Sequence, residues 1–64
     1  MERLLGVKDV AEILCVSEGW VRDHATRKRP RLPVVKIGKY LRFRGTDIER
    51  WIQEMTVVIG GTTW

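Results

Sequence analysis

Basic side chains are concentrated in one stretch of this 64-residue sequence, Arg27 to Arg44, which holds eight Lys or Arg and no acid. Cations at this density suit the neutralisation of a polyanion, because each one releases a condensed counterion from a phosphate backbone. Residues 21–44 carry a net charge of +8, whereas the segments before and after them carry −2 each. This concentration predicts a nucleic-acid contact surface; the alternative is a solvated face that keeps the protein in solution.

Residue types suited to catalysis or metal binding are few. Cys15 and His24 are the only soft ligand candidates, too few for a zinc site. The sequence has no glycine-rich phosphate loop and no nucleophile paired with a base. Tyr40 stands among arginines like a recombinase nucleophile, but 64 residues leave no room for the rest of such a site. We therefore predict no enzymatic activity and no cofactor or metal.

Length and composition predict one small domain. The sequence is 44% hydrophobic, which is typical of a globular protein rather than a disordered one. A single cysteine fits a reducing compartment, and no apolar run approaches the length of a membrane span. No basic-then-apolar leader opens the sequence. These features predict a soluble cytoplasmic protein.

Two helices separated by a short connection should position part of the basic surface. The first is predicted from Val7 to Leu14, where apolar residues recur at i, i+3, i+4 and i+7 behind Gly6 as N-cap. The second is predicted from Glu18 to Arg27, with Ser17 as N-cap and Val21 and Ala25 facing inward. Only three residues separate them, which indicates a helix-turn-helix unit. The outward positions of the second helix are Glu18, Gly19, Arg22, Asp23 and Thr26.

A β-hairpin is predicted between Val34 and Arg44, because apolar residues alternate there and Gly38 supplies a turn. A two-residue loop, Gly38-Lys39, would mix faces, with Val35 opposite Arg42 and Lys36 opposite Leu41. A three-residue loop separates apolar from basic side chains and pairs Ile37 with Leu41, Val35 with Phe43, Lys36 with Arg42, and Val34 with Arg44. We favour the second register.

The favoured register gives the hairpin one buried face and one basic face, with Lys39 at its tip. Lys36 then lies opposite Arg42, and like charges directly opposite across strands are destabilising. A bound anion would remove that repulsion, so the basic face is expected to lie against a polyanion. The alternative for Arg42 is an ion pair with an acid such as Asp47.

A third helix is predicted to start at Thr46, because Thr46 to Glu49 has capping-box spacing. Its inward residues, Ile48, Trp51, Ile52 and Met55, should close the core over the hairpin, and Trp20 and Trp51 are expected to pack rather than to stack on bases. We predict a DNA-binding unit over residues 1–55 and a tail over residues 56–64. The tail is expected either to fray or to contact a partner.

The order of these elements resembles the excisionase family, small winged helix-turn-helix proteins related to the DNA-binding domains of MerR-type regulators. The resemblance covers Leu4 to Met55, and the matching residues are Leu4-Leu5, Val10-Ala11-Glu12, Val16-Ser17, Val21, Gly38, Arg42-Phe43-Arg44, Thr46-Asp47-Ile48 and Trp51. It implies an α+β, mainly α fold with two short helices, a β-hairpin wing and a C-terminal helix.

The sequence departs from the family pattern at three positions. Gly6 replaces a Ser or Thr cap, and Trp20 replaces a small hydroxyl residue. Cys15 replaces the Gly of the tight turn, and a positive φ there would cost about 1 kcal/mol or more.

The resemblance implies sequence-specific binding to double-stranded DNA in a bacterial cytoplasm, with nucleoid association when bound. Excisionases bind neighbouring direct repeats cooperatively, bend the DNA and help a partner integrase excise a phage or mobile element. MerR-type regulators add a long dimerisation helix, for which this sequence leaves no length, so a free-standing excisionase is expected. The alternatives are a small transcriptional regulator of a phage or mobile element and a protein-interaction module.

Three groups of residues are expected to contact DNA. On the second helix Arg22 would pair with guanine or contact a phosphate, and Glu18 would accept from cytosine; Asp23 is a second candidate for a base contact. The alternative is an ordinary Glu18–Arg22 surface pair. Lys39 is expected to enter the minor groove from the wing tip. The full set is Ser17, Glu18, Gly19, Arg22, Asp23 and Thr26 on the helix, Arg27, Lys28, Arg29 and Arg31 at its exit, and Lys36, Lys39, Arg42 and Arg44 on the wing.

Overall fold

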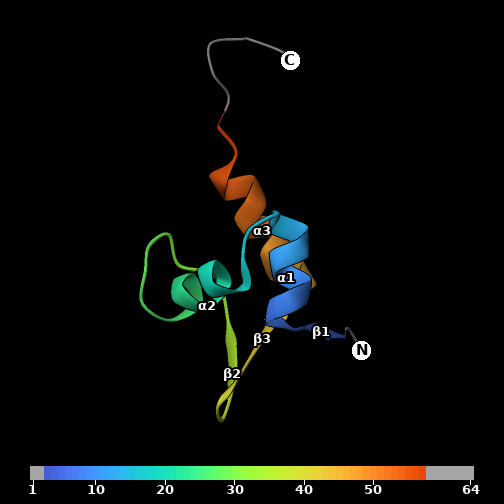
Figure 1. Ribbon diagram of the computed structural model, residues 1–64. Helices are drawn as coiled ribbons and strands as arrows, with labels where there is room; N and C mark the ends of the chain where they lie inside the picture. Colours follow the sequence, from blue (N-terminus) through green and yellow to red (C-terminus); the bar gives the residue numbers. More distant parts are fainter. Residues whose placement is uncertain (1–2, 58–64) are drawn as a thin grey trace.

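Three helices and a three-stranded antiparallel sheet make up the computed structural model, which describes residues 3–57 (Figure 1). Along the chain these are β1 (Leu4–Leu5), α1 (Val7–Leu14), α2 (Glu18–Thr26), β2 (Val35–Ile37), β3 (Tyr40–Arg44) and α3 (Gly45–Met55). The predicted α+β, mainly helical fold of the winged helix-turn-helix kind is confirmed. The β2–β3 hairpin projects from one end of the molecule, and α3 leads away at the other (Figure 1).

Local capping explains why the first two helices begin where the sequence predicts. Asp9 Oδ2 accepts from the Gly6 backbone N–H at 2.9 Å, and Gly6 adopts an extended conformation as N-cap of α1. Ser17 Oγ accepts from the Trp20 N–H at 3.0 Å and thereby satisfies a free donor in the first turn of α2. α2 ends at Thr26 with Arg27 as its C-cap, one residue earlier than predicted.

The turn between α1 and α2 depends on a left-handed residue. Cys15 has φ 58° and ψ 44°, and its N–H bonds to the carbonyls of Ala11 and Glu12. A residue with a Cβ pays about 1–2 kcal/mol in this conformation. The thiol offsets little of that cost, because it is exposed and donates only a weak bond of 3.7 Å to the Glu12 carbonyl.

Replacing Cys15 by Gly is expected to raise the free energy of unfolding by about 0.5–1 kcal/mol, since removing the Cβ relieves the strain and the more flexible unfolded chain takes back part of the gain. Urea denaturation followed by circular dichroism measures the change. Cys15→Ala is the control, because it removes the thiol and keeps the Cβ. An equal gain in both variants would show that strain at this residue is not the cause.

The sheet contains a further strand, β1, which was not predicted. β1 pairs with β3, with Leu4 opposite Arg44 and Leu5 opposite Phe43, so the strand order is β1-β3-β2. Two residues are too short to display an alternating pattern. The pairing brings the beginning of the chain beside the hairpin and places Leu5 on the same face as Phe43.

The predicted register of the hairpin is wrong. The structure has the two-residue loop, which pairs Val35 with Arg42, Lys36 with Leu41 and Ile37 with Tyr40. Gly38 has a φ of +60°, and Cys15 is the one described non-glycine residue with positive φ, so the turn has the φ signs of type II′. The twist of that turn matches the twist of paired strands, which favours the tighter loop over a clean separation of faces.

The observed register changes which side chains share a face. Val34 packs against the core, while Ile37 is 49% exposed on the face that carries Tyr40 and Arg42. Lys36 lies opposite Leu41 rather than Arg42. The predicted repulsion between Lys36 and Arg42 is therefore absent, and this pair needs no anion to neutralise it.

α3 also differs from its prediction. It begins at Gly45 with Arg44 as N-cap, so Thr46 lies in the first turn and the predicted capping box does not form the helix start. Ile48 is buried and Trp51 packs against the core, as predicted. Ile52 and Met55 are exposed, Met55 by 45%, because the C-terminal part of α3 extends past the other elements (Figure 1).

The core lies where the three helices and β3 meet. Its buried residues include the predicted Val21 and Ala25, with Trp20 packed beside them. Leu32, from the segment between α2 and β2, is a core residue that was not predicted. The complete buried set is Val10, Ala11, Val21, Ala25, Leu32, Phe43 and Ile48. Within residues 3–57, every helix is too short or too polar to cross a membrane.

Candidate nucleic-acid interface

A groove of about 610 Å³ lies between the start of α1, the start of α2 and the β2–β3 hairpin. Four of the predicted contact residues line it together: Glu18 and Arg22 from α2, and Lys39 and Arg42 from the hairpin. Lys8 from α1 and Tyr40 from β3 line it as well, and neither was predicted. We call this surface the recognition groove. Its cations come from three separate elements, so the fold rather than the local sequence gathers them.

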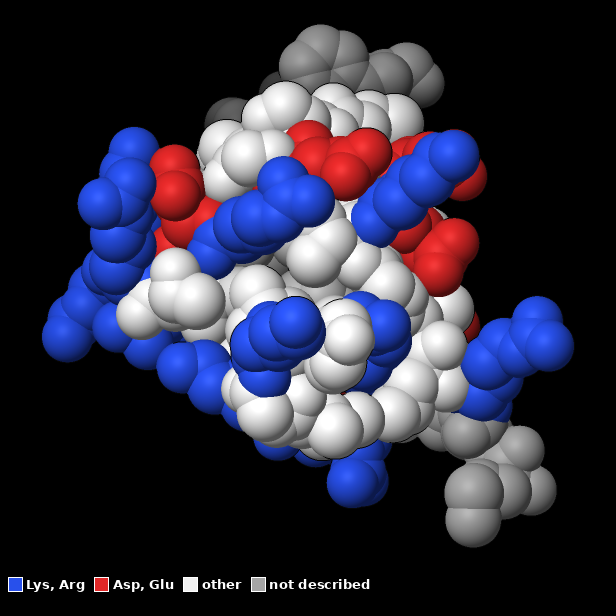
Figure 2. Space-filling model, turned by 60° about the horizontal axis from the view of Figure 1, so that its bottom comes forward, with Lys and Arg blue, Asp and Glu red and all other residues white. Residues whose placement is uncertain are grey.

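Figure 2 shows the hairpin end of the molecule, where Lys and Arg side chains spread across the full width of the surface. Most of the acidic side chains in that view lie in its upper half (Figure 2). The net charge of the sequence is +4, and many of its cations lie around this end of the molecule (Figure 2). Such an arrangement attracts a polyanion from a distance and retains it on contact.

Tyr40 organises the basic residues of the hairpin. The Lys39 ammonium lies 5.6 Å from the centroid of the Tyr40 ring, and the Arg42 guanidinium lies 5.4 Å from it. Arg42 Nη1 also donates to the Leu41 carbonyl at 2.8 Å, rather than to Asp47 as the alternative interpretation proposed. Cation–π contacts of this kind restrain long side chains while leaving their donors open to an anion.

Lys36 and Arg44 lie on opposite faces of the sheet. Arg44 is opposite Leu4 and shares a face with Arg42, two residues earlier in β3. Lys36 is opposite Leu41 and lies on the other face. Both side chains are exposed. The hairpin therefore carries cations on both faces and at its tip, not on one face as predicted.

Arg22 and Glu18 form the ordinary surface pair that the sequence left open. Arg22 Nη2 lies 3.4 Å from Glu18 Oε1, and the two side chains are about half exposed, at 59% and 47%. A pair this exposed contributes only a few tenths of a kcal/mol. The pair holds Arg22 along the recognition groove at little cost, and the guanidinium keeps free donors for a second partner.

Two more of the predicted contact residues, Ser17 and Thr26, bond to the backbone of α2 in this structure. Ser17 caps the helix, and Thr26 Oγ1 donates to the Arg22 carbonyl at 2.8 Å. An added Cβ at Gly19 would meet only Ser17 Oγ at 3.9 Å, an ordinary contact. Packing within the protein therefore does not require glycine at position 19.

Asp23 is engaged by the cations at the exit of α2. Its carboxylate lies 3.2 Å from Arg27 Nη2 and 3.7 Å from Lys28 Nζ. Its backbone carbonyl accepts from the N–H groups of both residues at 2.8 Å. Asp23 thus pairs with the exit cations in this structure, and its contact with a base stays a prediction. Arg29 and Arg31 follow on the same loop with exposed side chains.

Residues 4–56 match the family model described as a helix-turn-helix domain. The match spans α1, the Cys15 turn, α2, the hairpin and α3. No curated protein and no solved structure matches the chain.

Proposed function

The chain belongs to the helix-turn-helix domain family, a DNA-binding domain also found in excisionase-like proteins, and we propose that it is itself an excisionase. In this role it binds repeated sites cooperatively, bends the DNA and directs a partner integrase towards excision of a phage or mobile element. The observation that carries the proposal is the recognition groove, in which Arg22 of the helix-turn-helix and Lys39 and Arg42 of the hairpin converge.

The proposed binding mode places α2 in the major groove and the hairpin in an adjacent minor groove. Arg22 has the planar donor pair that recognises guanine O6 and N7. Lys39 at the tip, with Lys36 and Arg42 on opposite faces, suits a minor groove because that groove has a phosphate wall on each side. The observed register thus supports a hairpin whose cations contact the phosphates on both sides of the minor groove.

The exit cations contribute sequence-independent affinity in this mode. Arg27, Lys28, Arg29 and Arg31 are exposed, and phosphates are the partners that such side chains contact most often. If about six phosphates are neutralised in total, the logarithm of the binding constant falls with the logarithm of salt concentration at a slope near −5.

Gel shifts on the attachment site of the encoding element, with and without its integrase, test the proposal. Discrete ladders together with stimulated excision are the expected result. Binding at a promoter with a changed transcript level, and no effect on excision, would instead identify a transcriptional regulator of the element. Failure to bind any duplex would contradict both functions and favour a protein-interaction module.

We also propose that residues 1–55 form the DNA-binding unit and that residues 56–64 contact a neighbouring copy or the integrase. Val57, at the start of this tail, is 75% exposed, and residues 58–64 lie outside the described residues. Deleting residues 57–64 is expected to leave single-site binding unchanged and to reduce cooperativity or excision. Unchanged cooperativity and unchanged excision in the deletion variant would remove this role for the tail.

A further inference from the structure

The loop of residues 27–34, between α2 and β2, contains no helix or strand but is tied to the domain at several points. Its first two N–H groups bond to the Asp23 carbonyl, and the Leu32 N–H donates to the His24 carbonyl at 2.9 Å. The Leu32 side chain is 3% exposed and belongs to the core. The loop is thus fixed on its inner side while its four basic side chains remain exposed.

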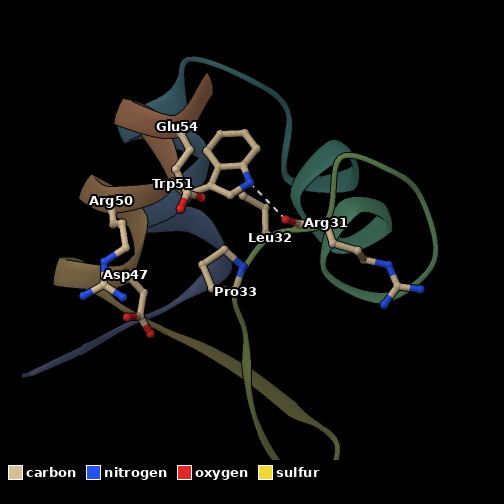
Figure 3. Close-up of a pocket in the computed structure, with 7 residues that line it drawn as sticks. All are labelled: Arg31, Leu32, Pro33, Asp47, Arg50, Trp51 and Glu54. Carbon is tan, nitrogen blue, oxygen red and sulfur yellow. Dashed lines mark hydrogen bonds between the residues drawn. The ribbon is translucent and has the colours of Figure 1, made fainter. Parts of the chain in front are cut away.

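Two consecutive carbonyls of this loop accept hydrogen bonds from aromatic side chains. His24 Nδ1 lies 3.0 Å from the Pro30 oxygen, and Trp51 Nε1 donates to the Arg31 oxygen at 2.9 Å (Figure 3). A carbonyl can only accept, so His24 carries its hydrogen on Nδ1. Hydrogen bonds from α2 and α3 therefore hold the backbone at Pro30, which follows Arg29, and at Arg31 itself.

The two donor rings are themselves held by a third ring. Trp20 stacks on His24 with centroids 3.8 Å apart and an interplanar angle of 16°. It also meets Trp51 edge-on, at 6.5 Å and 73°. Because Trp20 and His24 belong to α2 and Trp51 to α3, the rings connect the loop to two helices of the core.

We propose that His24 and Trp51 are positioning residues that hold Arg29 and Arg31 in place for DNA phosphates. The proposal rests on the DNA-binding function above and deepens it. A loop already fixed in the free protein does not have to be ordered on binding, and avoiding that entropy loss strengthens association. His24 and Trp51 thus act on affinity through the loop, without touching DNA.

A double-mutant cycle on the full chain tests the proposal. The anchor variant, H24F with W51F, removes both N–H donors and keeps an aromatic ring at each position. The charge variant, R29Q with R31Q, removes the two cations. Binding of all four combinations to a mixed-sequence duplex of about two helical turns is followed by fluorescence anisotropy over a range of salt, since phosphate contacts do not depend on sequence.

The anchor variant is expected to weaken binding about tenfold and to make the salt slope shallower by up to about 1.8, the value for two phosphates. In the charge-variant background the same anchor changes should alter affinity less than about twofold, because the cations through which they act are gone. In a K39Q background the loop cations are intact, so the anchor changes should still weaken binding about tenfold.

An anchor variant that binds like the parent, or that loses the same factor in both backgrounds, would overturn the proposal. Circular dichroism and thermal unfolding check that each variant is folded. If H24F with W51F does not fold, H24F alone takes the place of the anchor variant in the cycle. If the parent chain itself binds no duplex, the proposed function fails; if it binds and only the coupling is missing, this inference alone fails.

Discussion

Replacing both Arg22 and Lys39 by Ala is expected to weaken binding to the target duplex about a hundredfold. An arginine that pairs with guanine contributes about 1–3 kcal/mol of discrimination against other bases. Its loss also leaves the Glu18 carboxylate, 3.4 Å away in the parent chain, without its counter-charge in the recognition groove. In the proposed binding mode Lys39 adds one phosphate contact, so its removal should make the salt slope shallower by about 0.9.

The single variants separate the two contributions. Arg22→Ala should lower the ratio of specific to non-specific affinity, whereas Lys39→Ala should weaken binding to every duplex by a similar factor. Arg50→Ala is the matched control, because it removes one cation from α3, outside the residues that line the recognition groove. Filter binding or anisotropy measures all three. Unchanged affinity in the double variant would show that the recognition groove is not the contact surface.

Replacing Phe43 by Ala is expected to unfold most of the protein at room temperature. Phe43 is fully buried in β3 and lies opposite Leu5 of β1. Truncating a buried phenylalanine costs about 3–5 kcal/mol, through lost transfer free energy and the cavity left behind. A domain of 64 residues rarely has more than about 3–5 kcal/mol of stability in total, so little or none would remain.

Urea denaturation followed by circular dichroism gives the free energy of unfolding for each variant. Phe43→Leu keeps most of the buried volume and should cost less than about 1.5 kcal/mol. Tyr40→Ala, three residues earlier on an exposed position of the same strand, should change stability by about 0.5 kcal/mol or less. If Phe43→Ala unfolded at the parent midpoint, the core as described would be wrong.

The position of α1 and the start of α2 were predictable because their signals are local. The apolar spacing from Val7 to Leu14, with Gly6 before it, identified both ends of α1. Ser17 identified the start of α2, and the three-residue connection indicated the helix-turn-helix. The strain at Cys15 was likewise foreseen as a condition of so short a turn, and the φ of 58° meets that condition.

The hairpin register was not predictable from alternation alone. Val34 and Val35 are both apolar, so the pattern identifies a strand without deciding which of the two faces the core. The turn geometry at Gly38 sets the register of the hairpin, and in that register Val34 packs against the core. β1 gave no periodic signal, because it consists of Leu4 and Leu5 only.

Nine of the fourteen predicted contact residues are cations, and charge along the sequence does not indicate which surfaces lie together in the fold. Lys8 lies on α1, far in sequence from the basic stretch, yet it lines the recognition groove. Tyr40 carries no charge, and in the structure it lies beside two cations. The bonds from His24 and Trp51 to backbone carbonyls had no sequence signal, because any residue supplies a carbonyl.

The pairing of β1 with β3 has a consequence for how the chain acquires its structure. Leu4 and Arg44 are forty positions apart, whereas α1 and α2 contact each other across three residues. Local contacts form sooner than distant ones, because a short loop loses less entropy on closing. During synthesis α1 and α2 can therefore pack together early. Leu4 and Leu5 form their backbone pairs only after β3 has left the ribosome.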